Sequence, residues 1–174
     1  MRLFPLRILQ ALAALFALGG VTFAAAAADA DGEARLKLNV HVYGFSYHPD
    51  RDGVRRNGVN NEFNIGIGLN YTLREDEDAV SFLEAGVYRD SGKNLAKVAG
   101  LGYQFKFGKY WRLGGALVGV HSETYNEGRF FIAPLPIATV DLGPVKLNAI
   151  YVPRYRGYNE FAVFGFYFSL PLAW

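Results

Sequence analysis

The chain contains no cysteine in its 174 residues. This absence excludes a disulfide framework, a thiolate metal site and a cysteine nucleophile. Histidine is also scarce, because the whole chain holds only His41, His48 and His121. Imidazole chemistry in this protein must therefore use one of these three side chains.

A long apolar run is missing after residue 28. No later stretch approaches the roughly 20 continuous apolar residues that a membrane-spanning helix needs. If this part of the chain lies in a membrane, we expect it to cross as strands.

The chain after residue 28 has no net charge, because without Arg2 and Arg7 it contains 16 basic and 16 acidic residues. This balance does not support a nucleic-acid partner.

The first 28 residues have the pattern of a cleaved secretory signal peptide. Arg2 and Arg7 precede an apolar run over residues 11–28, and this run ends in alanines before acidic residues begin. An uncleaved membrane anchor is the alternative. Removal of residues 1–28 leaves 146 residues, 29–174, which is enough for a single domain.

Apolar residues recur with period two after the leader, which is typical of strands with one apolar face. In the first run, every second residue from Leu36 to Val42 is apolar, and the residues from Lys37 to Tyr43 form the other face. We expect eight such strands, over residues 35–48, 60–73, 80–89, 96–107, 111–122, 130–140, 145–155 and 160–172.

The predicted connections alternate in length. REDEDA, KFGKY and DLGP are short, whereas HPDRDGVRRNGVN, RDSGKN, SETYNEGR and RYRGYNE are mostly longer. Short turns at one end and longer loops at the other are typical of transmembrane barrels, and aromatic residues near the strand ends fit interfacial girdles. We predict an all-β fold, an eight-stranded antiparallel up-and-down transmembrane β-barrel in the bacterial outer membrane. A soluble lipocalin-like barrel, with its apolar face inward, is the alternative.

The second face of each strand lines the interior if the apolar face meets lipid. An eight-stranded barrel holds packed side chains or one small ligand. We predict a hydrogen-bonded plug toward the periplasmic end and, toward the outer end, an apolar slot that suits one acyl chain. Inward glycines that only relieve crowding are an equal alternative. The plug would contain Lys37, Asn39, Asn70, Glu84, Gln104, Lys106, Lys146 and Asn148, and the slot Tyr43, Gly66, Gly86, Tyr88, Gly102, Ile150 and Val152.

Candidate chemistry gathers at the predicted outer rim. His41 lies on the lumen face of the first strand and His48 starts the first outer loop. Alternation along the third strand turns Asp90 toward the same interior as His41, and Ser91 follows where that strand ends. An imidazole can take a hydroxyl proton, and a carboxylate can orient the imidazole, so these are components of acyl transfer. Asp-Ser-Gly is also an ordinary turn sequence.

Several motifs resemble one known family. The segment over residues 131–170 contains PLP, LGPV, IYVP, YN and an aromatic last strand in that order. It resembles the C-terminal third of the lipid A palmitoyltransferases of Gram-negative outer membranes. YRDSGKN resembles their aromatic-Lys-Asp-Ser stretch, and KVAGLGYQ follows at the family's distance. The resemblance implies an outer-membrane barrel enzyme that transfers a palmitoyl group from a phospholipid to lipid A without a cofactor.

The resemblance also implies catalytic residues. Asp90 and Ser91 match the acid and the hydroxyl of the family. A histidine inside the first strand completes that set. We favour His41 because it shares the lumen side with Asp90, and His48 is the alternative if the register slips.

Substrate-binding residues follow in the same way. Gly102 matches a glycine at the floor of the acyl-chain pocket, where a bulkier side chain would shorten the accepted chain, and Tyr88 is expected in the slot above. Pro134, Pro136 and Pro153 match prolines that flank a lateral opening. Proline lacks the amide that a sheet ladder needs, which would give lipids a route through the barrel wall.

The sequence departs from the family in two places. Only about seven residues separate Ala28 from the first strand, where the family has an amphipathic helix, and the first two strands lack the prolines of a second lateral opening.

We expect a membrane-embedded monomer with no metal. A lipid A deacylase and a non-enzymatic barrel are the alternatives. Candidates to meet lipid A phosphates are Arg55, Arg56, Arg129, Arg154 and Arg156.

Overall fold

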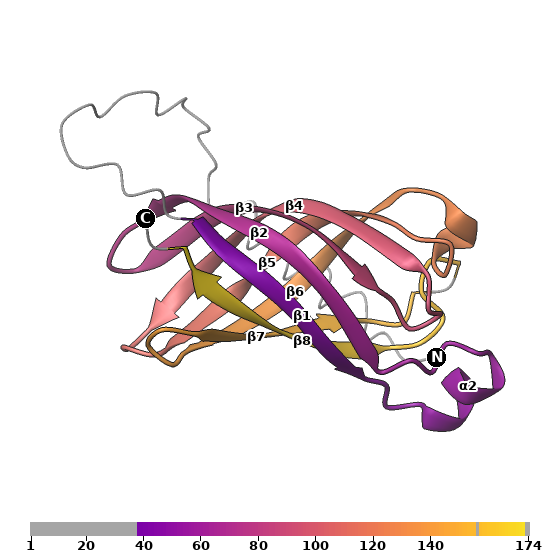
Figure 1. The fold of residues 1–174 in the computed structure, drawn as a ribbon. Coiled ribbons are helices and arrows are strands. Elements are labelled where there is room, and N and C mark those ends of the chain that lie inside the picture. Colours follow the sequence, from indigo (N-terminus) through magenta and orange to yellow (C-terminus); the bar gives the residue numbers. More distant parts are fainter. Residues whose placement is uncertain (1–37, 156, 173–174) are drawn as a thin grey trace, which may run out of the picture. The chain divides into compact units, whose positions relative to one another are not determined.

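The alternating segments form strands close to the predicted places. The computed structural model describes residues 38–155 and 157–172 (Figure 1). The predicted signal peptide and Lys37 lie outside these residues. The strands are β1 (Leu38–Tyr47), β2 (Phe63–Glu75), β3 (Ala79–Arg89), β4 (Leu95–Phe107), β5 (Trp111–His121), β6 (Phe131–Asp141), β7 (Lys146–Val152) and β8 (Val163–Pro171).

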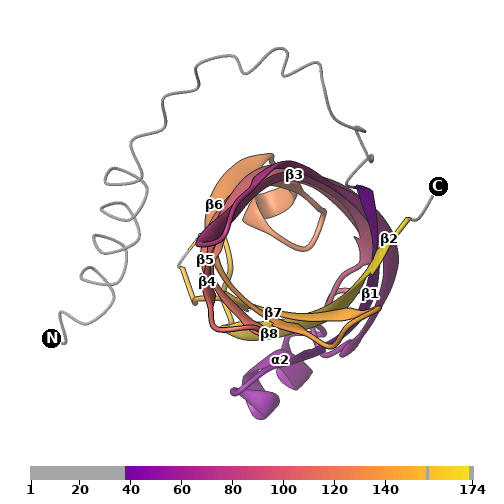
Figure 2. The ribbon, with the colours of Figure 1, turned by 90° about the vertical axis from the view of Figure 1, so that its left-hand side faces the viewer.

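Each strand pairs with the next in antiparallel direction, and β8 pairs with β1, so that the sheet closes into a barrel (Figure 2). This confirms the predicted eight-stranded antiparallel up-and-down barrel. Turns 76–78, 108–110 and 142–145 lie at one end, the short-turn end. Loops 48–62, 90–94, 122–130 and 153–162 lie at the other, the long-loop end.

The last two strands are shorter than predicted. β7 ends at Val152 because Pro153 has no amide hydrogen for the ladder. The chain then forms a loop in which the Asn159 carboxamide donates hydrogen bonds to the Pro153 carbonyl at 3.1 Å and the Phe161 carbonyl at 2.7 Å. β8 therefore begins only at Val163.

Two short helices interrupt the loops. α2 (Arg51–Arg56) begins at Asp50, whose side chain accepts a hydrogen bond from the Gly53 amide at 2.8 Å. In the view along the barrel, α2 lies outside the ring of strands (Figure 2). The 3-10 turn η1 (Asn126–Gly128) lies in loop 122–130, which covers part of the barrel mouth. Neither helix of the described residues is long and apolar enough to cross a membrane.

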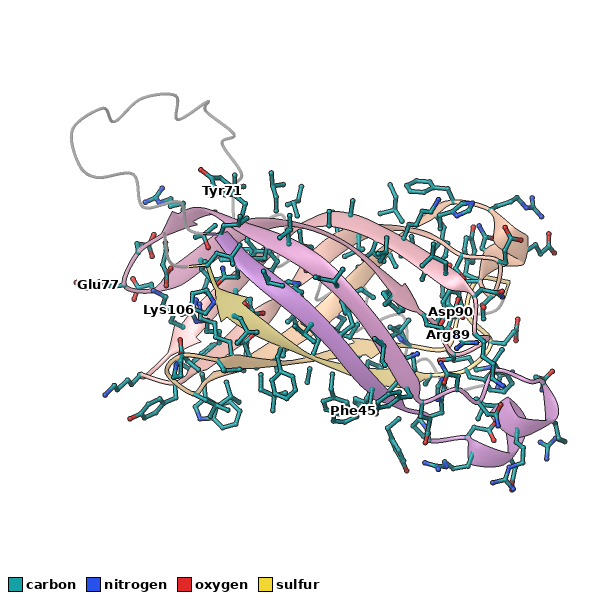
Figure 3. All side chains as sticks on the ribbon, in the orientation of Figure 1. Phe45, Tyr71, Glu77, Arg89, Asp90 and Lys106 are labelled. Carbon is teal, nitrogen blue, oxygen red and sulfur yellow. The ribbon has the colours of Figure 1, made fainter. Side chains whose placement is uncertain are left out.

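The barrel is apolar outside, and its interior carries polar side chains toward the short-turn end. On β2, the outward-facing Phe63, Ile65 and Ile67 are 66%, 60% and 60% exposed, whereas the inward-facing Asn64 and Asn70 are buried. Figure 3 shows side chains of this kind standing away from the wall along its length. This orientation is the reverse of the soluble alternative, which placed the apolar face inward.

The interior near the short-turn end is filled by polar side chains. The Gln104 amide donates to the Thr139 hydroxyl at 2.8 Å, and Thr139 donates to Asn148 Oδ1 at 2.7 Å. Closer to the turns, Glu75 pairs with Lys106 at 2.9 Å and with Arg112 at 3.4 Å. These contacts confirm the predicted hydrogen-bonded plug. Paired charges and hydrogen bonds make a polar barrel interior tolerable.

Candidate functional site

An apolar cavity of about 110 Å³ lies between the plug and the long loops. Every strand contributes to its lining, because each strand turns alternate side chains inward. Of the residues predicted for the slot, Tyr43, Tyr88, Ile150 and Val152 line this cavity. Gly66, Gly86 and Gly102 do not, because neighbouring side chains or backbone occupy the space beside them. The apolar part of the wall is formed by Val98, Val118, Leu135, Ile150, Val152 and Val163.

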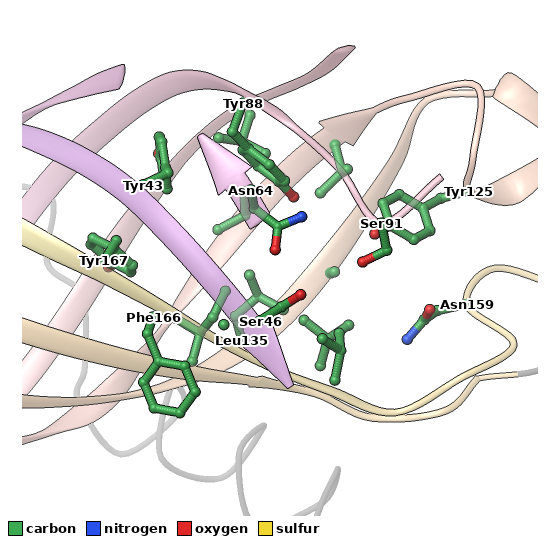
Figure 4. A pocket seen from close by; sticks show the side chains of 18 of the residues that line it. Tyr43, Ser46, Asn64, Tyr88, Ser91, Tyr125, Leu135, Asn159, Phe166 and Tyr167 are labelled. Carbon is green, nitrogen blue, oxygen red and sulfur yellow. The ribbon is translucent and has the colours of Figure 1, made fainter. Parts of the chain in front are cut away.

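Ser91 stands at the mouth of this cavity beside Tyr125 (Figure 4). Both residues line the cavity, and Ser91 is 3% exposed. Burial and the charge of Asp90 raise the pKa of Tyr125 to about 12, although hydrogen bonding to Ser91 opposes the rise. The Tyr125 phenol is therefore neutral at physiological pH and can donate a hydrogen bond toward the cavity.

The Asp90 carboxylate holds the loops that form the mouth. One oxygen, Oδ1, accepts hydrogen bonds from the Gly92 and Asn94 amides, each at 2.9 Å. The same oxygen accepts from the Thr124 hydroxyl at 2.8 Å, and Oδ2 accepts from the Ser122 hydroxyl. Asp90 is fully buried. It therefore joins the β3–β4 turn, which carries Ser91, to loop 122–130.

The structure does not bring His41 to Asp90. His41 pairs with Gly68 and Gly68 pairs with Gly86, four residues before Asp90 on β3. Four residues of a strand span about 13 Å. The imidazole lies in the plug instead, where its Nδ1 is 3.8 Å from Glu84 Oε2 and its ring centroid is 4.8 Å from that of Tyr167.

His48 is also absent from the described cavity lining. It is buried just beyond β1, with Nδ1 3.9 Å from Glu62 Oε1. Burial lowers the pKa of His48, and the neighbouring Glu62 carboxylate partly offsets that effect. The expected grouping of histidine, Asp90 and Ser91 is therefore not formed, and only the last two residues meet at the cavity mouth.

Gly102 faces the interior as predicted, but it does not line the apolar cavity. Phe82 pairs with Gly102 across β3 and β4, and a Cβ atom at residue 102 would clash with the Phe82 ring. The ring fills the space that the missing side chain leaves. Phe82 also packs against Val118 and Ile137 and lines the polar cavity of the plug, whereas Tyr167 lines both this polar cavity and the apolar cavity. The structure therefore does not place Gly102 at the floor of the described cavity.

The strand pairing of the barrel wall is incomplete beside the prolines that were predicted to flank a lateral opening. β6 pairs with β7 only from Ile137 to Asp141, whereas it pairs with β5 from Phe131 to Val140. Pro134 and Pro136 lie in the part of β6 that has only β5 as a ladder partner, and Pro153 follows the end of β7. Residues of this unpaired edge, among them Leu135 and Val152, line the cavity.

Of the arginines expected to meet phosphates, Arg55 and Arg56 are exposed at the end of α2. Arg129 pairs with Glu127, and Arg154 lies 3.8 Å from Glu160. Arg156 lies outside the described residues.

The sequence interpretation missed a group of basic residues on the outer wall. Lys97 on β4 is the ladder partner of His121 on β5. Arg89 lies on β3, two residues beyond Val87, which is the β3 partner of Lys97. All three residues are exposed. The Arg89 Nε atom donates a hydrogen bond to the Lys93 carbonyl at 3.3 Å, which holds the guanidinium over the turn (Figure 3). We call Arg89, Lys97 and His121 the wall cluster.

Within residues 38–155 and 157–172, no group of three or more histidine or carboxylate side chains could hold a metal ion. A scan against protein-family models found no matching family, and a search of curated proteins found no match.

Proposed function

We propose that the chain is an outer-membrane acyltransferase that moves a palmitoyl group from a phospholipid to lipid A. One observation carries the proposal: the Ser91 hydroxyl lies in the wall of an apolar cavity, at the end where the long loops meet. The part of an acyl chain nearest its ester would lie in the cavity, with the ester carbonyl beside Ser91. The motifs shared with the lipid A palmitoyltransferases support the same reaction.

Membrane insertion is supported by the outward apolar surface. Exposed apolar residues cover the wall of β1 to β5 and β8, and an extensive exposed apolar surface is typical of a membrane contact. In this proposal the barrel is a monomer in the bacterial outer membrane, and the long-loop end faces the cell exterior, as long loops do in barrels of this kind.

The unpaired edge of β6 offers a route for the acyl chain. Backbone groups without a ladder partner are costly within lipid, so a barrel keeps such an edge only where something covers or uses it. We propose that lipids enter between Pro134 and Pro153, because the cavity wall runs along this edge. A bilayer lipid would then reach the cavity without passing the loops.

The transfer exchanges one ester for another. A lipid A hydroxyl forms the new bond to the acyl carbon, the bond to the phospholipid glycerol oxygen breaks, and the proton passes to the lysophospholipid that leaves. Ser91 would act as the nucleophile or as a donor to the developing oxyanion. The neutral Tyr125 phenol is placed to donate a second hydrogen bond.

A non-enzymatic barrel that only binds acyl lipids is the second candidate. The positions of the histidines favour it, since His41 lies in the plug and His48 does not line the cavity. Lipid A deacylation is a third outcome, in which water receives the acyl group.

Mass spectrometry of lipid A from cells with and without the gene separates these functions. The proposal predicts a gain of one palmitoyl mass, deacylation predicts the loss of an acyl mass, and a binding protein predicts no change. Ser91→Ala should remove the gain. Unchanged lipid A in cells whose outer membrane contains the folded barrel would contradict the proposal.

A further inference from the structure

Two buried polar atoms face the apolar cavity without a protein partner. Ser46 and Asn64 are each 8% exposed, and both line the cavity. Among the described residues, Ser46 Oγ and Asn64 Oδ1 have no hydrogen-bond partner. Figure 4 shows the two side chains directed toward the same part of the cavity. Buried polar atoms are almost always hydrogen-bonded in folded proteins, so both atoms require an explanation.

The backbone turns Ser46 inward by a bulge. The register of β1 shifts between Tyr43 and Phe45 against both neighbouring strands. Tyr43 faces the interior, Phe45 is 48% exposed on the outer wall, and Ser46 is again buried. A bulge of this kind redirects a side chain at a defined position. The Ser46 hydroxyl therefore reaches an otherwise carbon-lined wall.

Asn64 is oriented by its own hydrogen bond. Its Nδ2 atom donates to the Arg89 carbonyl at 2.9 Å, at the end of β3. This bond fixes which end of the carboxamide points away from the cavity, and it leaves Oδ1 as an acceptor. Ser46 and Asn64 come from neighbouring strands, joined here by the hydrogen bond from the Ser46 amide to the Glu62 carbonyl at 2.9 Å.

The pair defines the chemistry of its ligand. Asn64 Oδ1 can only accept a hydrogen bond, so the ligand must bring an O–H or N–H group. The Ser46 hydroxyl can donate as well as accept. An alcohol satisfies both atoms, because it donates to Asn64 and accepts from Ser46. An ammonium group could donate to both atoms, but it would leave the Ser46 hydroxyl hydrogen without an acceptor and would place a charge in a mostly apolar cavity. A plain alkyl chain satisfies neither atom.

We propose that Ser46 and Asn64 form a hydroxyl-binding subsite, and that the cavity prefers a hydroxylated acyl chain to an unsubstituted chain of equal length. This inference rests on the proposed acyl-binding cavity and specifies its ligand class. The subsite lies between the deep Tyr43 and Tyr167 and the mouth residue Ser91 (Figure 4). The hydroxyl is therefore near the ester end of the chain.

The test uses the refolded full barrel in phosphatidylcholine nanodiscs and a matched pair of probes, 3-hydroxymyristic acid and myristic acid. Calorimetry gives the dissociation constant of each. We expect the hydroxylated probe to bind about tenfold more tightly, because each net hydrogen bond contributes a few-fold to affinity. Ser46→Ala and Asn64→Ala should bring the ratio of the two constants close to one, whereas Ser46→Thr, which keeps the hydroxyl, should preserve the preference.

Thr72→Val is the matched control. Thr72 is a polar residue of β2 that is buried to a similar extent as Asn64. It lines a separate polar cavity of about 30 Å³ within the plug and not the apolar cavity. Circular dichroism verifies that each variant is folded. Equal affinity for both probes in the wild type would overturn the subsite and leave the proposed transferase intact. A preference that survives Ser46→Ala and Asn64→Ala would also overturn it. Binding of neither probe would contradict the acyl cavity and the subsite together.

Discussion

The Thr124 hydroxyl donates a hydrogen bond to Asp90 Oδ1 at 2.8 Å and thereby ties loop 122–130 to the β3–β4 turn. Asp90 was expected to orient a histidine side chain. In the structure its carboxylate instead holds two loops together. Its carboxylate organises the segments that carry Ser91 and Tyr125.

We predict that Asp90→Ala lowers both stability and any Ser91-dependent activity. Four hydrogen bonds end on this buried carboxylate, and loss of the buried acceptor should cost about 3 kcal/mol or more of the free energy of unfolding. Urea-induced unfolding in detergent measures the change. Thr124→Val should act in the same direction by about 1 kcal/mol. Full stability in Asp90→Ala would show that the carboxylate does not hold the mouth together.

Phe82 is predicted to limit the depth of the acyl cavity. Phe82→Ala removes a ring that packs against Val118 of the cavity wall and lines the polar cavity of the plug, at a cost of about 3 to 5 kcal/mol in stability. The variant should accept acyl chains that are several carbons longer than those of the wild type. Binding of a series of fatty acids measures the length profile. Phe105→Ala, on the outer wall, is the control, and an unaltered profile in Phe82→Ala would reject this floor.

Lipid entry at the unpaired edge can be tested with a disulfide, because the chain has no native cysteine. Leu135→Cys with Val152→Cys would join β6 to β7 beyond their last paired residues, Ile137 and Ile150. Acyl transfer should fall on oxidation and recover on reduction. The control pair, Ala138→Cys with Ala149→Cys, joins positions that are already paired. Equal activity in the oxidised and reduced forms of the first pair would argue against this route.

The wall cluster is predicted to bind the phosphates of membrane lipids. Like charges at neighbouring positions of a sheet are unfavourable, and an anion would relieve this repulsion. Arg89→Gln combined with Lys97→Gln should weaken retention of phosphorylated lipid A about thirtyfold, since each cation near an anionic lipid surface contributes roughly 1 kcal/mol. Native mass spectrometry measures the retained lipid. Lys109→Gln, at the short-turn end, is the control, and equal retention in the double variant would refute the assignment.

His48 should make the barrel less stable in mild acid. Its folded-state pKa is lowered by burial from 6.5, so below that pH the unfolded chain binds a proton that the folded state resists. The free energy of unfolding therefore falls as the pH drops below about 6.5 and recovers as the pH rises. His48→Gln should reduce this slope in urea titrations at pH 5 and pH 8. An identical slope in both proteins would exclude His48 as its source.

Alternation along the strands was sufficient to predict the barrel, the polar plug and the apolar slot, because pleated strands turn successive side chains to opposite faces. It could not predict the level of a residue along the barrel. His41 and Asp90 share the interior, but strand pairing places His41 opposite residues four positions before Asp90. The bulge after Tyr43 turns Ser46 inward, where uninterrupted alternation along β1 would turn it outward, and only Gly44 in the sequence hints at this bulge. The prediction for Gly102 took no account of Phe82, its partner on the neighbouring strand β3.

The most direct test of the central claim is acyl transfer by the purified, refolded barrel. The assay supplies a phospholipid with an isotope-labelled palmitoyl group and lipid A as the acceptor, and mass spectrometry follows both products. We predict labelled lipid A and lysophospholipid in equal amounts, with a loss of about a hundredfold or more in Ser91→Ala and none in Ser81→Ala, at the other end of β3. Label that stays in the phospholipid, or transfer by Ser91→Ala at the wild-type rate, would contradict the account.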